Sequence, residues 1–324
     1  MEGMMKLFKK KYIWAIVYSI WLISFTVYVA LDTFVIKRVY TVLPQEQGES
    51  QAEGKAESKA EGKADTQEAD DLSGNENTVN ESVTKNTYSD ENINITVTTY
   101  REYDTTIYVA DITVSSIEYL QTAFAESSYG RNVTEKTSEI ADGTNAILAI
   151  NGDYYGARES GYVIRNGTLY RNTASKGQED LVIYDDGSFG IVSEEDVTAE
   201  ELLENGAVQV LSFGPALIRD GSTVVSKEDE VGKAMTSNPR TAIGIVDDLH
   251  YLFVVSDGRT TKSKGLSLYQ LAEFMGSLGT VTAYNLDGGG SSTMYFNGEV
   301  INNPTTSGKR IKERSVSDIV YIGY

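Results

Sequence analysis

The chain has 324 residues, which is enough for one large domain or two modest ones, and its net charge of −19 argues against nucleic acid as a partner. It contains no cysteine, which excludes disulfides, thiolate catalysis and zinc–thiolate sites. Any Ser–His mechanism would have to use the single histidine, His250. Because His250 opens an apolar strand after two aspartates, we interpret it as structural.

The first hydrophobic stretch predicts a membrane anchor. Residues 12–31 carry no charge over the length that spans a bilayer, and aromatic side chains lie near both ends. The stretch is too long for a cleaved signal peptide, and no small-x-small site follows it. The larger basic flank precedes it, so we expect a cytoplasmic tail at 1–11, a single-pass anchor at 12–36 and an extracytoplasmic remainder. The alternative is a buried helix of a soluble domain.

Residues 37–91 have the composition of a linker. They are rich in small, polar and charged residues, and residues 52–63 repeat Ala-Glu-Gly/Ser-Lys with a period of four. This period places like charges one above another on a helix, which is unfavourable. We therefore expect a disordered, acidic, low-complexity linker that holds a folded domain away from the membrane.

The remainder, residues 92–324, is predicted to be one domain made mainly of strands. Residues 93–100 alternate apolar and polar side chains, residues 106–114 form a second run, residues 117–125 show helical spacing, and residues 144–150 read as a buried strand. Hairpin turns are predicted at four dipeptides, namely Asn166-Gly167, Asp186-Gly187, Asp220-Gly221 and Asn297-Gly298.

The helix with the clearest signals begins after Ser267, which forms a capping box with Gln270, and stops at Gly279. A polar helical patch covers residues 197–204, and the last strand covers residues 318–322. Strands dominate and helices are few. The fold class is therefore predicted to be α+β with a largely antiparallel sheet.

Asp287 stands at the end of an apolar run and is followed by three glycines and two serines. A backbone without Cβ atoms lets a ligand approach closely, and its N–H groups can form an anion-binding concavity. Asp287 could act on a bond, hold a sugar hydroxyl or bind a cation. The structural alternative is a tight turn capped by an aspartate.

Three further polar clusters also lie at the ends of apolar runs. They are Asn151 with Asp153, Arg240 with Thr241, and Asp257 with Arg259. Arginine suits a phosphate through paired hydrogen bonds, and two carboxylates suit cleavage of a glycosidic bond. The order of these motifs along the chain resembles the phosphodiester glycosidase family, from residue 92 to residue 324.

The resemblance rests on five stretches and a C-terminal pair of motifs. They are Ala149-Ile150-Asn151-Gly152-Asp153-Tyr154-Tyr155, Phe213-Gly214-Pro215, Arg240-Thr241-Ala242-Ile243-Gly244, Asp257-Gly258-Arg259, Asn285-Leu286-Asp287-Gly288-Gly289-Gly290-Ser291-Ser292, and Asn303-Pro304 with Glu313-Arg314. It implies a hydrolase that cleaves a sugar from a glycan phosphodiester in a polar cavity, in cell-envelope or exopolysaccharide metabolism.

Matched by motif, the resemblance implies catalytic roles for Asp287, Asp257 and Arg240. The implied substrate-binding residues are Asn151, Asp153, Thr241, Arg259, Gly288, Gly289, Gly290, Ser291, Ser292 and Arg314. Arg240 and Arg314 would clamp the phosphate, and Asp287 and Asp257 would form the acid/base or nucleophile pair. Mammalian members have Gly and Phe where this chain has Asp153-Tyr154-Tyr155, so Asp153 inherits no role from them.

Two other functions fit the same residues. One is a phosphodiesterase that breaks the P–O bond, and the other is a non-catalytic glycan-binding or assembly protein of the same fold. We expect no cofactor and no required metal, although Asp153, Asp257 and Asp287 offer the oxygen ligands that calcium, magnesium or manganese prefer. The expected partners are a glycan phosphodiester substrate and the membrane.

Overall fold

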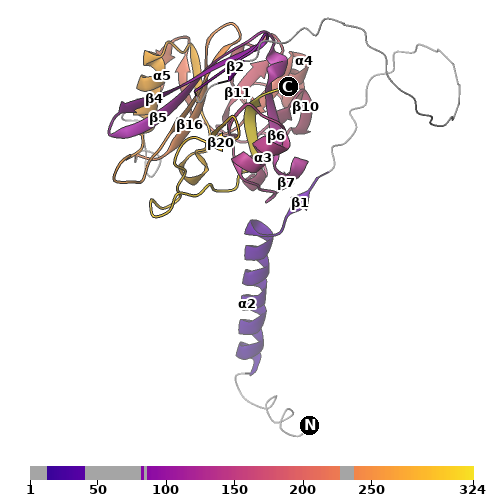
Figure 1. Ribbon diagram of the computed structural model, residues 1–324. Helices are drawn as coiled ribbons and strands as arrows, with labels where there is room; N and C mark the ends of the chain where they lie inside the picture. Colours follow the sequence, from indigo (N-terminus) through magenta and orange to yellow (C-terminus); the bar gives the residue numbers. More distant parts are fainter. Residues whose placement is uncertain (1–12, 41–81, 84–85, 227–236) are drawn as a thin grey trace, which may run out of the picture.

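The computed structural model describes residues 13–40, 82–83, 86–226 and 237–324. The expected cytoplasmic tail and most of the expected linker lie outside the described residues. The first described element, α2 (Ile13–Phe34), stands away from the folded domain (Figure 1). It has no buried side chain and is long and apolar enough to cross a membrane, judged by length and composition.

The largest sheet has nine strands in the order β15-β14-β18-β16-β17-β5-β4-β3-β2, and every described pairing in it is antiparallel. Its strands, in chain order, are β2 (Ser82–Val83), β3 (Thr87–Ser89), β4 (Ile93–Glu102), β5 (Thr105–Val114), β14 (Ala216–Arg219), β15 (Ser222–Thr223), β16 (Arg240–Asp247), β17 (His250–Ser256) and β18 (Thr282–Asn285).

Two five-stranded antiparallel sheets complete the strand framework. One has the order β20-β19-β8-β21-β6 and contains β6 (Leu120–Phe124), β8 (Leu148–Asn151), β19 (Met294–Phe296), β20 (Glu299–Val300) and β21 (Asp318–Ile322). The other has the order β10-β9-β13-β11-β12 and contains β9 (Val163–Arg165), β10 (Thr168–Arg171), β11 (Glu179–Tyr184), β12 (Phe189–Ser193) and β13 (Ala207–Leu211). The prediction of α+β with mainly antiparallel sheets is confirmed.

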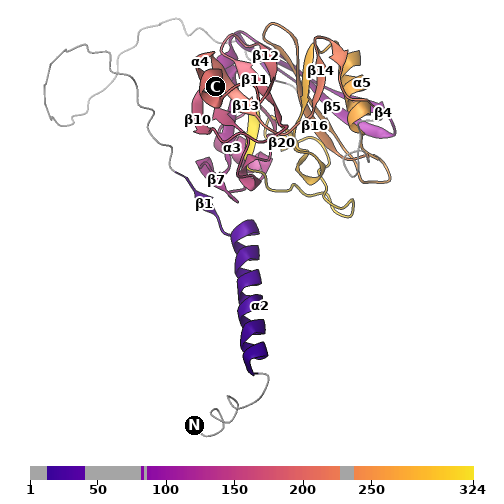
Figure 2. The ribbon, with the colours of Figure 1, turned by 180° about the vertical axis from the view of Figure 1, so that it is seen from behind.

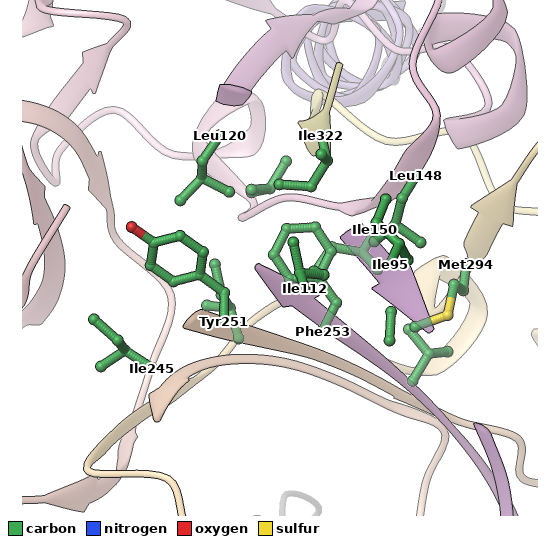
Figure 3. Close-up of a cluster of buried hydrophobic side chains, with 14 of the residues drawn as sticks. Ile95, Ile112, Leu120, Leu148, Ile150, Ile245, Tyr251, Phe253, Met294 and Ile322 are labelled. Atoms are coloured by element: carbon green, nitrogen blue, oxygen red, sulfur yellow. The ribbon is translucent and has the colours of Figure 1, made fainter. Parts of the chain in front are cut away.

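The three sheets share one hydrophobic core, because apolar side chains from all of them belong to the same buried cluster. Figure 3 shows Leu148 and Ile150 of β8 facing Phe253 of β17, with Ile322 of β21 beside them. The alternation along β5 explains how the nine-stranded sheet is covered on both faces. Ile112 points into this shared core, whereas Val109 belongs to the cluster on the opposite face.

Each sheet has one α-helix on its outer face among the described residues. They are α3 (Thr137–Gly143) on the sheet that contains β8, α4 (Ala199–Glu204) on the sheet that contains β13, and α5 (Leu268–Ser277) on the nine-stranded sheet. Figure 2 shows α5 and α4 at opposite sides of the domain. As predicted, Ser267 caps α5 by accepting from the N–H of Gln270. Gly279 follows α5 with a positive φ of 85°.

The four predicted hairpin turns are confirmed, since each dipeptide joins two strands that pair with each other. The helix expected over 117–125 is wrong. These residues form a 3₁₀ turn, η1 (Ile117–Tyr119), the strand β6 and a second 3₁₀ turn, η2 (Ala125–Ser127). Leu120 and Thr122 are buried on alternate positions of β6, which is the period of a strand. The helix α3 was not predicted, because its seven residues are too few to show a helical period.

The range assigned to the linker contains strands of the folded domain. β1 (Arg38–Val39) pairs with β7 (Gly130–Arg131), and β3 joins the nine-stranded sheet next to β4. The described residues 38–39 and 87–89 therefore belong to the folded domain, and residues 41–81 lie outside the described residues. Figure 1 shows β1 and β7 together at the base of the domain, directly above the end of α2.

Candidate active site

A cavity of about 290 Å³ opens where β8 and β18 end and where the chain enters β21. Among the described residues, its lining consists of Thr33, Phe34, Asn132, Thr134, Asp153, Tyr154, Gly156, Ala157, Asp287, Arg314, Ser315, Val316 and Ser317. Three of the predicted site residues are among them, which are Asp153, Asp287 and Arg314. These three are charged, and they lie beside apolar and aromatic lining residues that include Phe34, Tyr154 and Val316.

Asp287, Ser291 and Arg314 form a closed hydrogen-bonded triangle. Asp287 Oδ2 accepts from Ser291 Oγ at 2.7 Å and from Arg314 Nη2 at 2.7 Å, and Arg314 Nε donates to the same Ser291 Oγ at 2.8 Å. Within the described part of the chain, Asp287 Oδ1 accepts no hydrogen bond from the protein. The carboxylate is thus oriented through one oxygen, and its other oxygen is available to a ligand.

The glycine loop after Asp287 is shaped by close backbone packing. Gly289 has φ +65°, and a Cβ there would lie 2.9 Å from Arg259 Nη2, so glycine fits this position best. Its N–H donates to the carbonyl of Pro239 at 2.8 Å and is not free for an anion. Gly288, Gly290 and the buried Ser292 do not line the cavity.

Asn151 holds the carboxylate loop from behind. Its Nδ2 donates to the backbone carbonyl of Asp287 at 2.6 Å, and its Oδ1 accepts from Thr241 Oγ1 at 2.8 Å and from Thr293 N at 3.3 Å. Asn151 and Thr241 are both completely buried. The structure therefore brings these two predicted residues to the site as supports of Asp287, and neither reaches the cavity.

Asp153 belongs to a buried cluster with Arg165 and Asp318. Arg165 Nη2 donates to Asp153 Oδ2 and to Asp318 Oδ2, both at 2.8 Å, and its Nε donates to Asp318 Oδ2 at 3.0 Å. Asp153 also accepts from the backbone N–H groups of Tyr155 and Ser212. Asp153 is 1% exposed, so its charge is balanced inside the protein.

Burial and neighbouring charges shift the pKa values of the two carboxyl groups of this cluster in opposite directions. Burial raises the pKa of Asp318 to about 8, and the negative charge of Asp153 adds to this effect against the attraction of Arg165. Burial also acts to raise the pKa of Asp153, but the Arg165 guanidinium and two N–H donors outweigh it and lower that pKa. Arg165 therefore favours the ionised form of Asp153, whereas burial favours the neutral form of Asp318.

Arg240, Asp257 and Arg259 do not line the cavity, although Arg240 lies next to Gly288 and Arg259 next to Gly289. Arg240 Nε donates to the carbonyl of Leu266, and Arg259 Nη1 donates to the carbonyl of Thr306. Both oxygens of Asp257 accept from Asn303, one from its backbone N–H and one from its side chain, each at 2.8 Å. The predicted pair of Asp257 with Asp287 is thus not brought together in this cavity.

Arg165 and Asp318 belong to the buried cluster with Asp153, but neither residue was predicted from the sequence. Arg165 ends the short strand Val163–Arg165. A charged residue at the end of an apolar strand has to be paired if it is buried, so this position indicates an ion pair. Asp318 opens a strand whose five residues are all buried, which is the same kind of signal. Burial could not be read from the sequence at either position.

Among the described residues, no group of three or more histidine, aspartate or glutamate side chains is arranged to hold a metal ion. Asp153 and Asp287 line one cavity, but Asp153 is bound to Arg165 and Asp257 lies elsewhere. His250 is far from this cavity in the fold, at the start of β17, where its Nε2 hydrogen-bonds with Asp111 at 2.8 Å.

The fold and the cavity define a domain of antiparallel sheets that presents a buried aspartate and an arginine at strand ends. The family model for phosphodiester glycosidase matches residues 144–323, which is more than half of the chain. The chain belongs to the phosphodiester glycosidase family. The family predicted from the sequence motifs is therefore confirmed.

Two relatives are similar to this chain in sequence. The chain is 30% identical over 205 residues to the SPbeta prophage-derived uncharacterized protein YomE of Bacillus subtilis, covering 61% of this chain and 31% of that protein. It is 30% identical over 192 residues to the human N-acetylglucosamine-1-phosphodiester alpha-N-acetylglucosaminidase, covering 54% of this chain and 36% of that protein. The chain thus spans about a third of the length of these relatives.

Solved structures share the fold. The catalytic domain of the zebrafish N-acetylglucosamine-1-phosphodiester alpha-N-acetylglucosaminidase, auto-inhibited by its pro-peptide, has a TM-score of 0.58 and 24% identity, covering 72% of this chain and 83% of that one. A hypothetical protein from Synechocystis has a TM-score of 0.53 and 15% identity, covering 72% and 62%. At these identities the likeness establishes the fold.

Proposed function

We propose that this chain is a membrane-anchored, extracytoplasmic hydrolase that releases a sugar from a glycan phosphodiester of the cell envelope or of an exported polysaccharide. Membership of the phosphodiester glycosidase family supports the reaction class. The apolar helix α2 and the basic residues before it support the anchor and its orientation.

One observation carries the catalytic part of this proposal. At the wall of the cavity, Asp287 is fixed through Oδ2 by Ser291 and Arg314, and Oδ1 is left to act on a substrate. A carboxylate oriented in this way either attacks the anomeric carbon or takes the proton of an attacking water. In this proposal Arg314, whose side chain is 40% exposed, binds the phosphate beside Asp287.

The leaving group explains why one catalytic carboxylate suffices, although Asp153 also lines the cavity. A phosphomonoester has a second pKa of about 6, so it departs as an anion near neutral pH without being protonated by an acid. A guanidinium can then replace the second carboxylic acid that glycosidases use for alcohol leaving groups. In this proposal Asp287 acts on the sugar side and Arg314 on the phosphate side of the bond.

The other predicted residues have supporting roles in this proposal. Asn151 and Thr241 position Asp287, and Asp153 shapes the cavity wall through its bond with Arg165. Arg240, Asp257 and Arg259 hold the glycine loop and the loop at Asn303. We retain direct substrate contacts by these three residues as a prediction to be tested by mutation.

The test is product analysis in oxygen-18 water with the full-length protein in detergent. A panel of glycosyl phosphodiesters that differ in the sugar serves as substrates. We expect the label in the released sugar, which marks cleavage of the C–O bond. Label in the phosphate would instead establish P–O cleavage by a phosphodiesterase. Binding of panel members without turnover would identify a glycan-binding protein.

A further inference from the structure

The cavity that contains Asp287 is built from two separate parts of the chain. Asp153, Asp287 and Arg314 come from the folded domain, whereas Thr33 and Phe34 come from the last turn of α2. The helix end is thus part of the wall of the candidate active site. Figure 1 and its reverse view in Figure 2 both show the end of α2 directly under the domain.

Residues 33–40, which we call the connecting segment, are fixed to the domain by hydrogen bonds. β1 pairs with β7, with Arg38 opposite Arg131 and Val39 opposite Gly130. The side chain of Asn132 donates to the carbonyl of Thr33 at 3.2 Å and to that of Ile36 at 3.1 Å. These bonds leave little freedom between the helix end and the cavity.

An aromatic stack joins the connecting segment to the cavity wall. The rings of Tyr40 and Tyr129 lie 5.7 Å apart, and Tyr129 stacks on Tyr155 at 5.3 Å. Tyr155 in turn donates its backbone N–H to Asp153 and lies under the Arg165 guanidinium. The connecting segment is therefore attached to the same buried cluster that shapes the site.

The length of α2 places this cavity at the membrane surface. Its 22 residues span about 33 Å at about 1.5 Å per residue, which matches a hydrocarbon core of about 30 Å. Phe34 at its end is 78% exposed, and Val39 is 65% exposed. Tyr154, which lines the cavity, is 45% exposed. Exposed apolar and aromatic side chains of this kind suit the interfacial region of a bilayer.

Resting on the proposed function, we infer that the substrate is a membrane-held glycosyl phospholipid, in which a phosphodiester joins a sugar to a lipid alcohol. The lipid chain stays in the bilayer beside α2, and the phosphate enters the cavity next to Arg314. A cavity fixed at headgroup depth meets such a phosphate directly, whereas a polymer in solution has to approach along the membrane surface.

The reaction on this substrate balances with water alone. The oxygen of water ends on the anomeric carbon, and the bond between that carbon and the phosphate oxygen breaks, directly or through a glycosyl ester of Asp287. The electron pair of this bond stays with the phosphate oxygen, and one proton of the water is released through Asp287. The products are a free sugar and a lipid phosphomonoester that remains in the bilayer.

The experiment uses the full-length protein in vesicles of phosphatidylcholine. Two substrates with the same sugar are compared at equal total concentration, one with a long-chain lipid alcohol in the bilayer and one with a methyl alcohol in solution. We expect the lipid substrate to be hydrolysed at least about tenfold faster. If neither substrate were hydrolysed, the proposed function would be overturned. Equal rates, or a preference for the methyl substrate or for a soluble polymer with the same linkage, would overturn the inference alone.

A variant tests whether the preference for the lipid substrate depends on the fixed position of the cavity next to α2 or only on attachment of the protein to the membrane. A Cβ at Gly130 would collide with the carbonyl of Arg38, so Gly130→Ala should release β1 from β7 while α2 stays in the bilayer. We expect this variant to lose the preference for the lipid substrate and to keep its rate on the methyl substrate. Gly143→Ala, where a Cβ meets nothing within 4 Å, is the matched control. An unchanged preference in Gly130→Ala would contradict the inference, and the wild-type comparison decides it if that variant does not fold.

Discussion

The side chain of Asn151 holds the backbone carbonyl of Asp287 with a hydrogen bond of 2.6 Å. The two residues are 136 positions apart in the chain, at the ends of strands that belong to different sheets. Because Asn151 also accepts from Thr241 and Thr293, one buried amide ties the carboxylate loop to both sheets. The position of the candidate catalytic group thus depends on where two sheets meet.

Asn151→Ala should therefore reduce both stability and activity. The change leaves buried partners of the amide without hydrogen bonds, which costs about 1–3 kcal/mol for each such group. We expect the free energy of unfolding to fall by about 2 kcal/mol or more in urea titrations. Thr241→Val, which removes one of these hydrogen bonds, should cost about 1 kcal/mol. Equal stability of Asn151→Ala and wild type would show that this amide does not support the loop.

Asp287→Asn should abolish turnover without unfolding the protein. The substitution keeps the shape of the side chain and removes the charge, so kcat should fall by about 10³-fold or more. The Asp287 side chain is 12% exposed and that of its partner Arg314 is 40% exposed, so the loss of this partly buried ion pair should lower the free energy of unfolding by about 1–3 kcal/mol. Activity and thermal unfolding are measured on the same samples.

Asp104→Asn is the matched control for this variant. Asp104 forms a surface ion pair with Lys264 in which both side chains are 68% exposed, and asparagine tolerates its positive φ of 55°. Its activity should equal that of the wild type. If Asp287→Asn retained most of the activity, Asp287 would not be the catalytic carboxylate.

The features that could be predicted from the sequence are those that neighbouring residues encode. The turn at Asn166-Gly167 and the Ser267 cap of α5 depend on a few consecutive residues, and both are present. Leu120 shows the limit of such reasoning. Its apolar spacing fits a helix, but pairing of β6 with β21, about 200 positions later, makes it a strand.

In the candidate site, too, local motifs could be recognised from the sequence, whereas contacts between distant residues could not. The family motif drew attention to Asp287 and Arg314, which the fold brings within hydrogen-bonding distance. Arg165 and Asp318 are 153 positions apart, and no local pattern indicates that they are partners. Asp153 is next to a recognisable motif, but its burial against Arg165 depends on the meeting of two sheets. The sequence therefore could not show which side chains become buried against residues that are distant in the chain.

Arg314→Lys should impair catalysis although the charge is kept. The guanidinium donates to Asp287 and to Ser291 through different nitrogen atoms, and a single ammonium group cannot reproduce this fork. We expect kcat/KM to fall by about 10²-fold, because the arginine also stabilises the departing phosphate. Steady-state kinetics on a soluble glycosyl phosphodiester measure this effect.

Arg219→Lys provides the comparison for that variant. Arg219 makes a partly exposed ion pair with Glu179, away from the cavity, so the same substitution there should leave kcat/KM unchanged. A similar kcat/KM for Arg314→Lys and wild type would mean that only the charge of Arg314 matters. In that case the paired hydrogen bonds would have no part in catalysis.

Asp318→Asn should stabilise the protein increasingly as the pH rises from about 4 to about 8. In the folded state burial raises the pKa of Asp318 to about 8, whereas in the unfolded chain its carboxyl group ionises near its ordinary value of 3.8. Between these values the folded state binds one more proton than the unfolded state, so wild-type stability falls with rising pH. Asparagine does not titrate, and its amide keeps a neutral group beside Arg165.

The measurement compares the free energies of unfolding of Asp318→Asn and wild type at pH 5 and at pH 8. The difference should favour the variant more at pH 8. Asp180, whose pKa burial raises to about 9, titrates in both proteins and cancels in this comparison. Asp153→Asn should behave differently, because it removes the ionised partner of Arg165 and should destabilise the protein at both pH values. A difference between Asp318→Asn and wild type that does not change with pH would show that Asp318 is ionised in the folded protein.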